Sequence, residues 1–264
     1  MISSLGIIGG GVMGEALLAR LLAQGQVDAA AVIVSEPFAA RRELLSDRYG
    51  VKCVADNAEA AQADWLLLAI KPQVFDAAVE GLANLRRDRL ILSILAGVPL
   101  ARLEAAFPGE AVIRAMPNTP ATVGAGVTAI AAGQQVTADQ LSQAQDFFAA
   151  VGRVVTVPES QLDAVTGLSG SGPGYVALII EALSDGGVAA GLPRAIATEL
   201  AIQTVRGTAE LLQDTGWHPG ELKDRVCSPG GTTIAGVATL ESHGLRSALI
   251  EAVKAAALRS QQLG

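Results

Sequence analysis

The stretch LGIIGGGVMG, residues 5–14, decides the fold. Its first four residues predict a short buried β-strand, and apolar residues at three-to-four spacing predict a helix over residues 13–24. Between them, Gly9, Gly11 and Gly14 have the GxGxxG spacing, which alone is weak but in a strand–turn–helix context is typical of dinucleotide-binding folds. The three glycines allow, in order, a tight turn, close approach of the backbone to a pyrophosphate and close helix–strand packing. A glycine-rich turn without a ligand is the alternative.

Outward from this stretch, short apolar runs alternate with amphipathic segments. Strands are expected at residues 5–8, 31–35, 51–54, 65–70, 90–95 and 112–116, and two later ones at 127–131 and 154–157. Helices between them are expected at residues 13–24, 39–48, 74–82 and 138–150. Such alternation predicts an α/β fold with a Rossmann-type, doubly wound parallel sheet.

After about residue 159 the pattern changes to helices alone. These are expected at residues 165–191, 194–214, 221–227, 233–243 and 245–263. We therefore predict a dinucleotide-binding domain over residues 1–158 and an all-helical domain over residues 159–264. Residues 176–182 carry only one charge, Glu181, and a helix that is apolar on almost every side needs a partner. That partner is expected to be a second subunit.

The composition excludes several classes of protein. The 264 residues are 50% hydrophobic but only 3% aromatic, and the net charge is −7. An acidic chain with a pI of about 4.9 has no basic excess for general nucleic-acid binding. The mean hydropathy is +0.41, yet no apolar run approaches the roughly 20 residues of a membrane-spanning helix. No nucleic acid or membrane is expected as a partner, and the excess of apolar side chains indicates subunit association.

Cysteine and histidine are scarce. Cys53 and Cys227 offer neither a disulfide framework nor a CxxC metal spacing, and the chain has only two histidines. A metal centre is therefore not expected. The N-terminal residues show no basic segment before an apolar run, so we see no secretory signal and expect a cytoplasmic protein.

The second predicted strand ends at Ser35 and Glu36, about 20 residues after Gly14, where the adenine ribose is expected. A carboxylate at Glu36 would bind both ribose hydroxyls and disfavour a 2′-phosphate, which favours NAD. Ser35, with Arg41 and Arg42 a turn later, would instead suit that phosphate, although the two arginines are equally consistent with a solvated helix face. The cofactor is therefore NADP or NAD, with no strong preference expected.

The carboxyl ends of the fourth and fifth strands line the crevice in which an open parallel sheet binds ligands. The sequence AIKP, residues 69–72, ends the fourth strand, and LAG, residues 95–97, ends the fifth. Their small residues allow the nicotinamide half to lie close to the backbone. Lys71 is a candidate acid, but a partly exposed charge at a strand end is the more ordinary interpretation.

Three further stretches indicate a second site. AMPNTP, residues 115–120, leaves the sixth strand and is interrupted by two prolines. LSGSGPGY, residues 168–175, and SPGGTT, residues 228–233, each lead into a helix. Backbone N–H groups and hydroxyls at a helix N-terminus suit a small carboxylate, although simple N-capping is the alternative for either turn. Two such turns behind a dinucleotide fold favour a substrate site.

Together these stretches resemble the pyrroline-5-carboxylate reductase family over essentially the whole chain. The matches are IIGGGVMG at residues 7–14, AIKP at 69–72, RAMPNTP at 114–120, the segment 163–172 and HPGELKD at 218–224. CSPGGTT at residues 227–233 with Leu240 and Glu241 resembles the family signature. Two residues depart from the pattern: Gly174 stands where the family often has alanine, and Glu36 where a small polar residue is common.

The resemblance implies a function, a set of site residues and an assembly. The implied function is NAD(P)H-dependent reduction of the cyclic imine of 1-pyrroline-5-carboxylate to L-proline. The dinucleotide would be held by Gly9, Gly11, Val12, Met13, Gly14, Ser35, Asn57, Ala69, Ile70, Lys71, Pro72, Ala96 and Gly97, with Glu36 at the ribose. The substrate would be bound by Glu159, Ser169, Gly170, Ser171, Gly172, Gly230, Gly231, Thr232 and Thr233. Thr233 would contact the ring nitrogen. The assembly would be a homodimer through the helical domain, with a higher oligomer also possible.

Two rival functions remain open. A β-hydroxyacid dehydrogenase of similar layout would need a general acid–base for an alcohol, usually a lysine in the glycine-rich helix, and residues 175–191 contain none. A nucleotide-sensing module would bind NAD(P)H without turnover. Imine reduction needs no strong acid, since the substrate can arrive protonated, so a site without histidine or cysteine favours the reductase.

Overall fold

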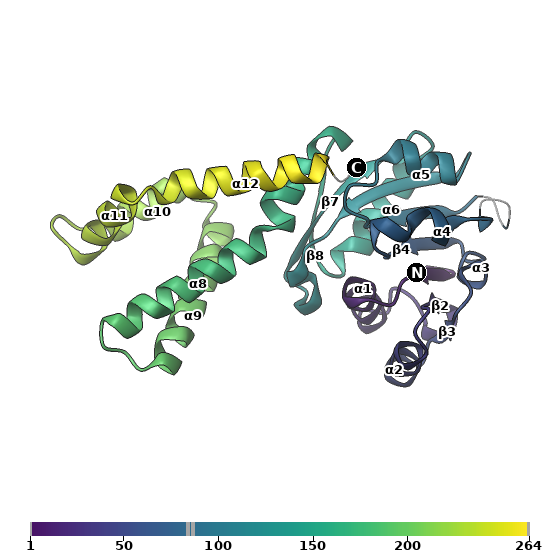
Figure 1. Cartoon of the computed structure of the whole chain (residues 1–264), viewed down its shortest axis with the longest axis horizontal. Coiled ribbons are helices and arrows are strands. Elements are labelled where there is room, and N and C mark those ends of the chain that lie inside the picture. The colour runs from purple at the N-terminus through teal and green to yellow at the C-terminus, as the bar shows by residue number, and fades with distance from the viewer. Residues whose placement is uncertain (1, 83–84, 86–87, 263–264) are drawn as a thin grey trace. The chain divides into compact units, whose positions relative to one another are not determined.

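The computed structural model describes residues 2–82, 85 and 88–262. The chain divides into two compact units: one holds the residues up to Ser171 and those from Ala255 on, and the other spans Gly172–Lys254. The domain boundary predicted between residues 158 and 159, from the change to helices alone, stays a prediction. Figure 1 shows the first unit built around a sheet and the second built of helices.

The first unit contains an eight-stranded sheet in the order β3-β2-β1-β4-β5-β6-β7-β8. The strands are β1 (Leu5–Ile8), β2 (Val32–Ser35), β3 (Lys52–Val54), β4 (Trp65–Leu68), β5 (Leu90–Ser93), β6 (Ala111–Met116), β7 (Gly126–Ala132) and β8 (Gly152–Thr156). All neighbours are parallel except β6 and β7. The chain reverses outward on either side of β1, as in a doubly wound fold, so the predicted fold class is confirmed.

The antiparallel pair is a difference from the predicted doubly wound parallel sheet. A short 3₁₀ turn at Thr119–Val123 connects β6 to β7, and Ala115 pairs with Ile130. A parallel pair needs a crossover of about a dozen residues or more, usually a helix, and this connection is too short to supply one. The fourth and fifth strands also end at Leu68 and Ser93, slightly before the predicted ends.

Helices cover both faces of the sheet. They are α1 (Val12–Ala23), α2 (Ala39–Tyr49), α3 (Asn57–Ala60), α4 (Phe75–Val79), α5 (Leu100–Ala106), α6 (Ala138–Ala149) and α7 (Leu162–Val165). Alternate strand residues point to opposite faces, so Ile7 packs in one buried cluster and Ile8 in the other. Helices α1, α2 and α6 contribute to the first cluster, and α3, α4 and α5 to the second. Neither α3 nor α5 was among the helices predicted.

A buried ion pair joins the starts of two strands. Arg89 precedes β5 and Glu110 precedes β6, and their side chains are 0% and 3% exposed. Arg89 donates through Nε to Glu110 Oε2 at 2.8 Å and through Nη2 to Oε1, and its Nη1 donates to the carbonyl of Ala61 at 2.8 Å. Because every donor has a partner, the charge is accommodated in the core.

The second unit is helical, as predicted. It comprises α8 (Gly172–Ala189), α9 (Arg194–Thr215), α10 (Pro219–Val226), α11 (Thr232–Ser242) and the first part of α12 (Leu245–Gln261). Helices α8 and α9 pack side by side (Figure 1). The last residue of the predicted final helix, Leu263, lies outside the described residues.

The helix predicted over residues 165–191 is not continuous. Helix α7 ends at Val165, a π-helical turn follows at Thr166–Gly170, and α8 begins at Gly172. The interruption falls where glycines and Pro173 replace residues that favour a regular helix. In the part of the chain that the structure describes, we find no helix with the length and apolar character to span a membrane.

Candidate active site

The glycine-rich loop joins β1 to α1 in the predicted position. Gly9 has φ of +105°, and a Cβ there would lie 2.5 Å from the carbonyl oxygen of Ala69. A Cβ on Gly14 would lie 2.3 Å from the carbonyl oxygen of Gly9, so helix and turn approach too closely for any side chain. At Gly11, the N-cap of α1, a Cβ would meet nothing within 4 Å. The start of α1 thus presents open space and a helix N-terminus, which fits a pyrophosphate.

Two charged side chains hold the middle glycine of this loop. Gly10 donates its N–H to Glu36 Oε2 at 3.0 Å, and its carbonyl accepts from Arg41 Nε at 2.6 Å. The second oxygen of Glu36 accepts from the N–H of Phe38 at 3.1 Å, and Glu36 is only 6% exposed. Glu36 lies at the end of β2 as predicted, but both oxygens of its carboxylate accept hydrogen bonds from backbone N–H groups.

Arg41 also belongs to a polar cluster between α1 and α2. Glu15 accepts from Arg41 Nη2, from Arg48 Nη1 at 2.9 Å and from the hydroxyl of Tyr49 at 2.8 Å. Burial alone would raise the pKa of the Glu15 carboxyl, but the hydrogen bonds from Arg41, Tyr49 and Arg48 outweigh it, and the pKa lies below its usual value. Burial and the Glu15 acceptor raise the pKa of the Tyr49 phenol.

This cluster was missed by the sequence interpretation. Its signal is the spacing of Arg41 and Arg48, seven residues apart on α2, opposite Glu15 in the first turn of α1. Arg42 is not a purely solvated charge either: its Nη1 donates to the carbonyls of Glu36 and Pro37, both at 2.8 Å.

Ser35 and Asn57 lie together at the ends of their elements. Ser35 Oγ donates to Asn57 Oδ1 at 2.6 Å, and Asn57 Nδ2 donates to the carbonyl of Ala78 at 2.9 Å. Ser35 is buried at the end of β2, and Asn57 begins α3. The two predicted cofactor residues therefore form one hydrogen-bonded pair beside the carboxyl edge of the sheet.

A cavity of about 270 Å³ lies at the carboxyl edge of the sheet. It is lined by Met13, Ala69, Ile70, Ile94, Met116, Pro117, Asn118, Thr119 and Gly170. The structure thus brings together predicted cofactor residues from the start of α1 and from the segment after β4 with one predicted substrate residue, Gly170. Lys71, Pro72, Ala96 and Gly97 follow β4 and β5 but are not among the lining residues, and Lys71 is exposed.

Glu159 is engaged inside the first unit. Its Oε1 accepts from the N–H of Leu100 at 2.6 Å and from Arg114 Nη1 at 3.0 Å. Leu100 begins α5 and Arg114 lies in β6, so the carboxylate caps a helix and pairs with a strand residue. These bonds place Glu159 beside β6, the strand that leads into the MPNTP stretch.

The remaining predicted substrate residues are divided between the units. Ser169, Gly170 and Ser171 belong to the first unit, and Gly172 begins the second. Gly230, with φ of +65°, and Gly231 precede α11, whose first residues Thr232 and Thr233 are exposed. The N-cap Gly231 has no side chain to cap this helix, so the N–H groups of its first turn are available to a ligand.

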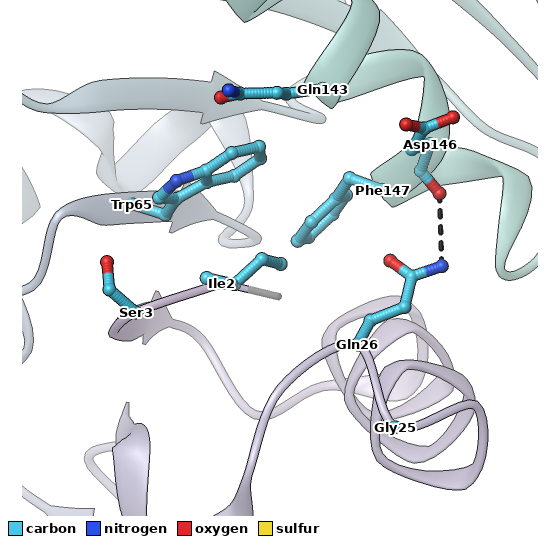
Figure 2. A pocket seen from close by; sticks show the side chains of 8 residues that line it. All are labelled: Ile2, Ser3, Gly25, Gln26, Trp65, Gln143, Asp146 and Phe147. Atoms are coloured by element: carbon cyan, nitrogen blue, oxygen red, sulfur yellow. Dashed lines mark hydrogen bonds between the residues drawn. The ribbon is translucent and has the colours of Figure 1, made fainter.

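A second hollow, of about 680 Å³, lies near the amino ends of β1 and β4. Figure 2 shows its side chains, among them Trp65 and Phe147, whose rings stack with centroids 5.7 Å apart. Gln26 Nε2 donates to the carbonyl of Asp146 at 3.1 Å across it (Figure 2). None of the predicted site residues lines this hollow. Open α/β sheets bind ligands at the carboxyl ends of strands, so we assign the candidate site to the smaller cavity.

A sheet of this topology, with an open glycine-rich turn and an uncapped helix start, is typical of the class of Rossmann-type dinucleotide-binding proteins. Among the described residues, no group of three or more His, Cys, Asp or Glu is placed to hold a metal ion. Comparison with known families agrees with the class: residues 4–97 match the model described as "NADP oxidoreductase coenzyme F420-dependent". Residues 159–263 match the model described as "Pyrroline-5-carboxylate reductase dimerisation".

Relatives and solved structures cover the whole chain. A pyrroline-5-carboxylate reductase of Synechocystis is 62% identical over 261 residues, which is 98% of each chain. One of Methanosarcina acetivorans is 44% identical over 98% of this chain and 97% of its own. A pyrroline-5-carboxylate reductase structure from Coxiella burnetii superposes with a TM-score of 0.93 at 34% identity, over 100% of this chain and 99% of that one. The chain belongs to the pyrroline-5-carboxylate reductase family.

A structure of the Plasmodium falciparum pyrroline carboxylate reductase has NADP bound. It superposes with a TM-score of 0.89 at 28% identity, over 99% of this chain and 98% of that one. The chain here is an NAD(P)-dependent oxidoreductase of the same family, and the coenzyme preference stays open.

Proposed function

We propose that this chain catalyses the NAD(P)H-dependent reduction of 1-pyrroline-5-carboxylate to L-proline, the last step of proline biosynthesis. The observation that carries the proposal is the cavity at the carboxyl edge of the sheet, where Met13 in the first turn of α1, the MPNTP stretch and Gly170 meet. Relatives that bear the name of this reductase over nearly their full length support it.

The open glycine-rich turn supports binding of the dinucleotide. We place the pyrophosphate against the N–H groups at the start of α1, where Gly11 leaves space and the helix dipole favours an anion. We place the adenine ribose beside Ser35 and Glu36, and the nicotinamide beside Ala69, Ile70 and Met13. The residues present fit NADP and NAD alike.

The substrate site is proposed from the family resemblance. Ser169, Gly170, Ser171 and Gly172, together with Gly230, Gly231 and Thr232, offer N–H groups and hydroxyls for the carboxylate. Thr233 is proposed to contact the ring nitrogen. Glu159 is proposed to act at the edge of this site, since its carboxylate is held by Leu100 and Arg114.

The chemistry requires little of the protein. The reduced nicotinamide, when bound, supplies a hydride. As the imine carbon gains it, the π electrons of the C=N bond move to nitrogen, which carries a proton in the iminium form of the substrate. The hydroxyl of Thr233 holds this N–H in place, and the glycine-rich turns orient the ring. No strong protein acid is needed, which agrees with the residues that line the cavity.

Steady-state turnover tests the proposal. The purified chain is mixed with 1-pyrroline-5-carboxylate and either NADPH or NADH, and loss of the reduced coenzyme is followed by absorbance. We expect turnover with this substrate and none with a β-hydroxy acid and the oxidised coenzyme. Tight coenzyme binding without turnover would favour the sensing module instead.

Residues 159–264 are proposed to form the homodimer and to carry the substrate turns. Exposed apolar side chains support this, since Leu178 of α8 is 67% exposed and Leu200 of α9 is 53% exposed. Within Gly172–Lys254, every residue of which is described, only Ser184, Ala197 and Ala201 are buried. So few buried residues do not form a core, which a second subunit would complete. Higher oligomers are also compatible with this surface.

A further inference from the structure

One side-chain amide bridges two segments of the first unit. Asn118 follows β6, in the MPNTP stretch, and lines the cavity at the carboxyl edge of the sheet. Its Oδ1 accepts from the N–H of Val127 at 2.9 Å, and its Nδ2 donates to the carbonyl of Ser169 at 3.1 Å. The amide therefore ties the start of β7 to the π-helical turn that carries Ser169.

The side chain of Asn118 does not cap the turn that it precedes. The residue is the N-cap of the 3₁₀ turn Thr119–Val123, with extended φ and ψ of −130° and 165°, but makes no side-chain cap bond. An asparagine at an N-cap ordinarily accepts from an N–H two or three residues later. Here the side-chain oxygen and nitrogen bond instead to Val127 and Ser169. Asn118 therefore connects segments that are distant in the sequence.

The carbonyl of Ser169 accepts its hydrogen bond from outside the turn. In a regular α-helix its donor would be the N–H of residue 173, but residue 173 is proline and has none. The turn around Ser169 is π-helical, with the N–H of Ser171 bonded to the carbonyl of Thr166 at 2.8 Å. Single π turns occur often at functional sites. Asn118 supplies the hydrogen bond that the proline removes.

The same turn contacts the side chain of the last residue of β6. A Cβ on Gly170 would lie 2.7 Å from Met116 Cε, the flexible end of that side chain. A trans peptide is planar, with C=O and N–H pointing in opposite directions. Fixing the carbonyl of Ser169 therefore also fixes the direction of the N–H of Gly170.

We propose that Asn118 is a positioning residue for the substrate: it fixes the Ser169–Gly170 peptide in the turn that lines the cavity, which is the turn that the proposed function places at the substrate carboxylate. The inference rests on the proposed function, in which Ser169, Gly170 and Ser171 bind that carboxylate. Asn118 acts through the turn and not on the reacting atoms.

The test compares Asn118→Ala, Asn118→Asp and a control, Gln145→Ala. Gln145 also donates an amide hydrogen bond between elements, to Thr156 Oγ1 at 3.0 Å, but it is not among the residues that line the cavity. Asn118→Asp keeps an acceptor for Val127 and removes the donor to Ser169. In both Asn118 variants we expect KM for 1-pyrroline-5-carboxylate to rise about 10-fold or more, with kcat within about threefold. In Gln145→Ala, both constants stay at the wild-type values.

Two readouts do not depend on turnover. The dissociation constant of NADPH, from a fluorescence titration, stays close to the wild-type value in all three variants, because the glycine-rich loop, Ser35 and Glu36, which are proposed to hold the pyrophosphate and the ribose, are untouched. Hydrogen–deuterium exchange of the peptide covering residues 166–172 becomes faster in both Asn118 variants only. Wild-type KM and wild-type exchange in Asn118→Ala or in Asn118→Asp would overturn the inference, as would a loss of NADPH affinity equal to the rise in KM. If the wild-type chain neither turns over the substrate nor binds L-proline, the proposed function fails, and the exchange comparison still decides whether Asn118 holds the turn.

Discussion

Single side chains decide how the glycine-rich loop is held. Glu36 was predicted at the adenine ribose because of its distance along the chain from Gly14. The structure places Glu36 directly after β2, where both of its carboxylate oxygens accept from the N–H groups of Gly10 and Phe38. A carboxylate in this position stabilises the loop for either coenzyme. We therefore expect the wild-type KM values for NADH and NADPH to lie within about a hundredfold, or less than about 3 kcal/mol.

Replacing Glu36 by glutamine tests this role. The glutamine keeps one acceptor oxygen but loses the charge-assisted hydrogen bond, so the loop is held less firmly. We expect the dissociation constants of NADH and NADPH to rise together by about fivefold, measured by fluorescence titration. Glu43→Gln, which removes an exposed carboxylate from the following helix α2, is the matched control. Tighter binding of NADPH alone in Glu36→Gln would show that Glu36 acts as a charge selector.

Replacing Thr233 by alanine tests the proposed contact with the ring nitrogen. A hydrogen bond made to the reacting group in the transition state is lost, so kcat/KM is expected to fall about 10- to 1000-fold. Thr239→Ala is the control, because Thr239 lies on the same helix and donates to the carbonyl of Ala235 at 3.1 Å. Steady-state kinetics with 1-pyrroline-5-carboxylate give the answer. Unchanged kinetics in Thr233→Ala would remove this residue from the mechanism.

At the scale of residues, the sequence predicts contacts between residues that are close together in the chain, and not contacts between distant ones. Gly9, Gly11 and Gly14 were predictable because the strand, the turn and the helix that need them are consecutive in the chain. The partners of Glu36 and Asn118 were not, because Gly10 and Ser169 lie 26 and 51 residues away and meet them only in the folded sheet. No local pattern marks such pairs.

At the scale of elements, periodicity predicted most strands and the longer helices. It missed the break at Thr166–Gly170, because the apolar pattern of residues 165–191 continues through it and only the glycines and Pro173 indicate it. It also did not reveal the antiparallel pairing of β6 and β7. Strand direction depends on the length of the connection, which an apolar pattern does not report.

The ion pair between Arg89 and Glu110 fixes the starts of β5 and β6. Glu110→Gln leaves the guanidinium of Arg89 buried without its countercharge, so we expect a loss of about 3–5 kcal/mol in the free energy of unfolding. Glu59→Gln is the control, because its pair with Lys52 is largely exposed and contributes little. Urea denaturation measures both. A Glu110→Gln variant as stable as the wild type would show that the core compensates for the lost charge.

At the scale of the whole molecule, the location of the apolar side chains explains the high hydrophobic content of the chain. The sheet unit buries its apolar residues in two clusters, while many of those in the helical unit remain exposed. The family model that matches residues 159–263 is a dimerisation model, which accounts for this surface. A hydrophobic content of 50% without a membrane-spanning helix among the described residues is thus consistent with burial between subunits.

If the exposed apolar side chains of the helical unit form the dimer interface, substitutions among them change the molecular mass of the protein in solution. We expect the full chain to sediment as a dimer or larger, and Leu178→Asp to shift it toward the monomer, because a charge would be buried at the interface. Leu44→Asp, at an exposed leucine on α2, should leave the mass unchanged. Sedimentation velocity compares the two. A wild-type chain that sediments as a monomer would refute the proposal.

The transfer of deuterium from coenzyme to product tests the central claim most directly. The chain is supplied with 1-pyrroline-5-carboxylate and with NADPH deuterated at the transferable position of the nicotinamide. The account predicts L-proline that carries one deuterium on the ring carbon that was the imine carbon, as read by mass spectrometry and NMR. Coenzyme oxidation that yields no deuterated proline, or no oxidation with either coenzyme, would contradict it.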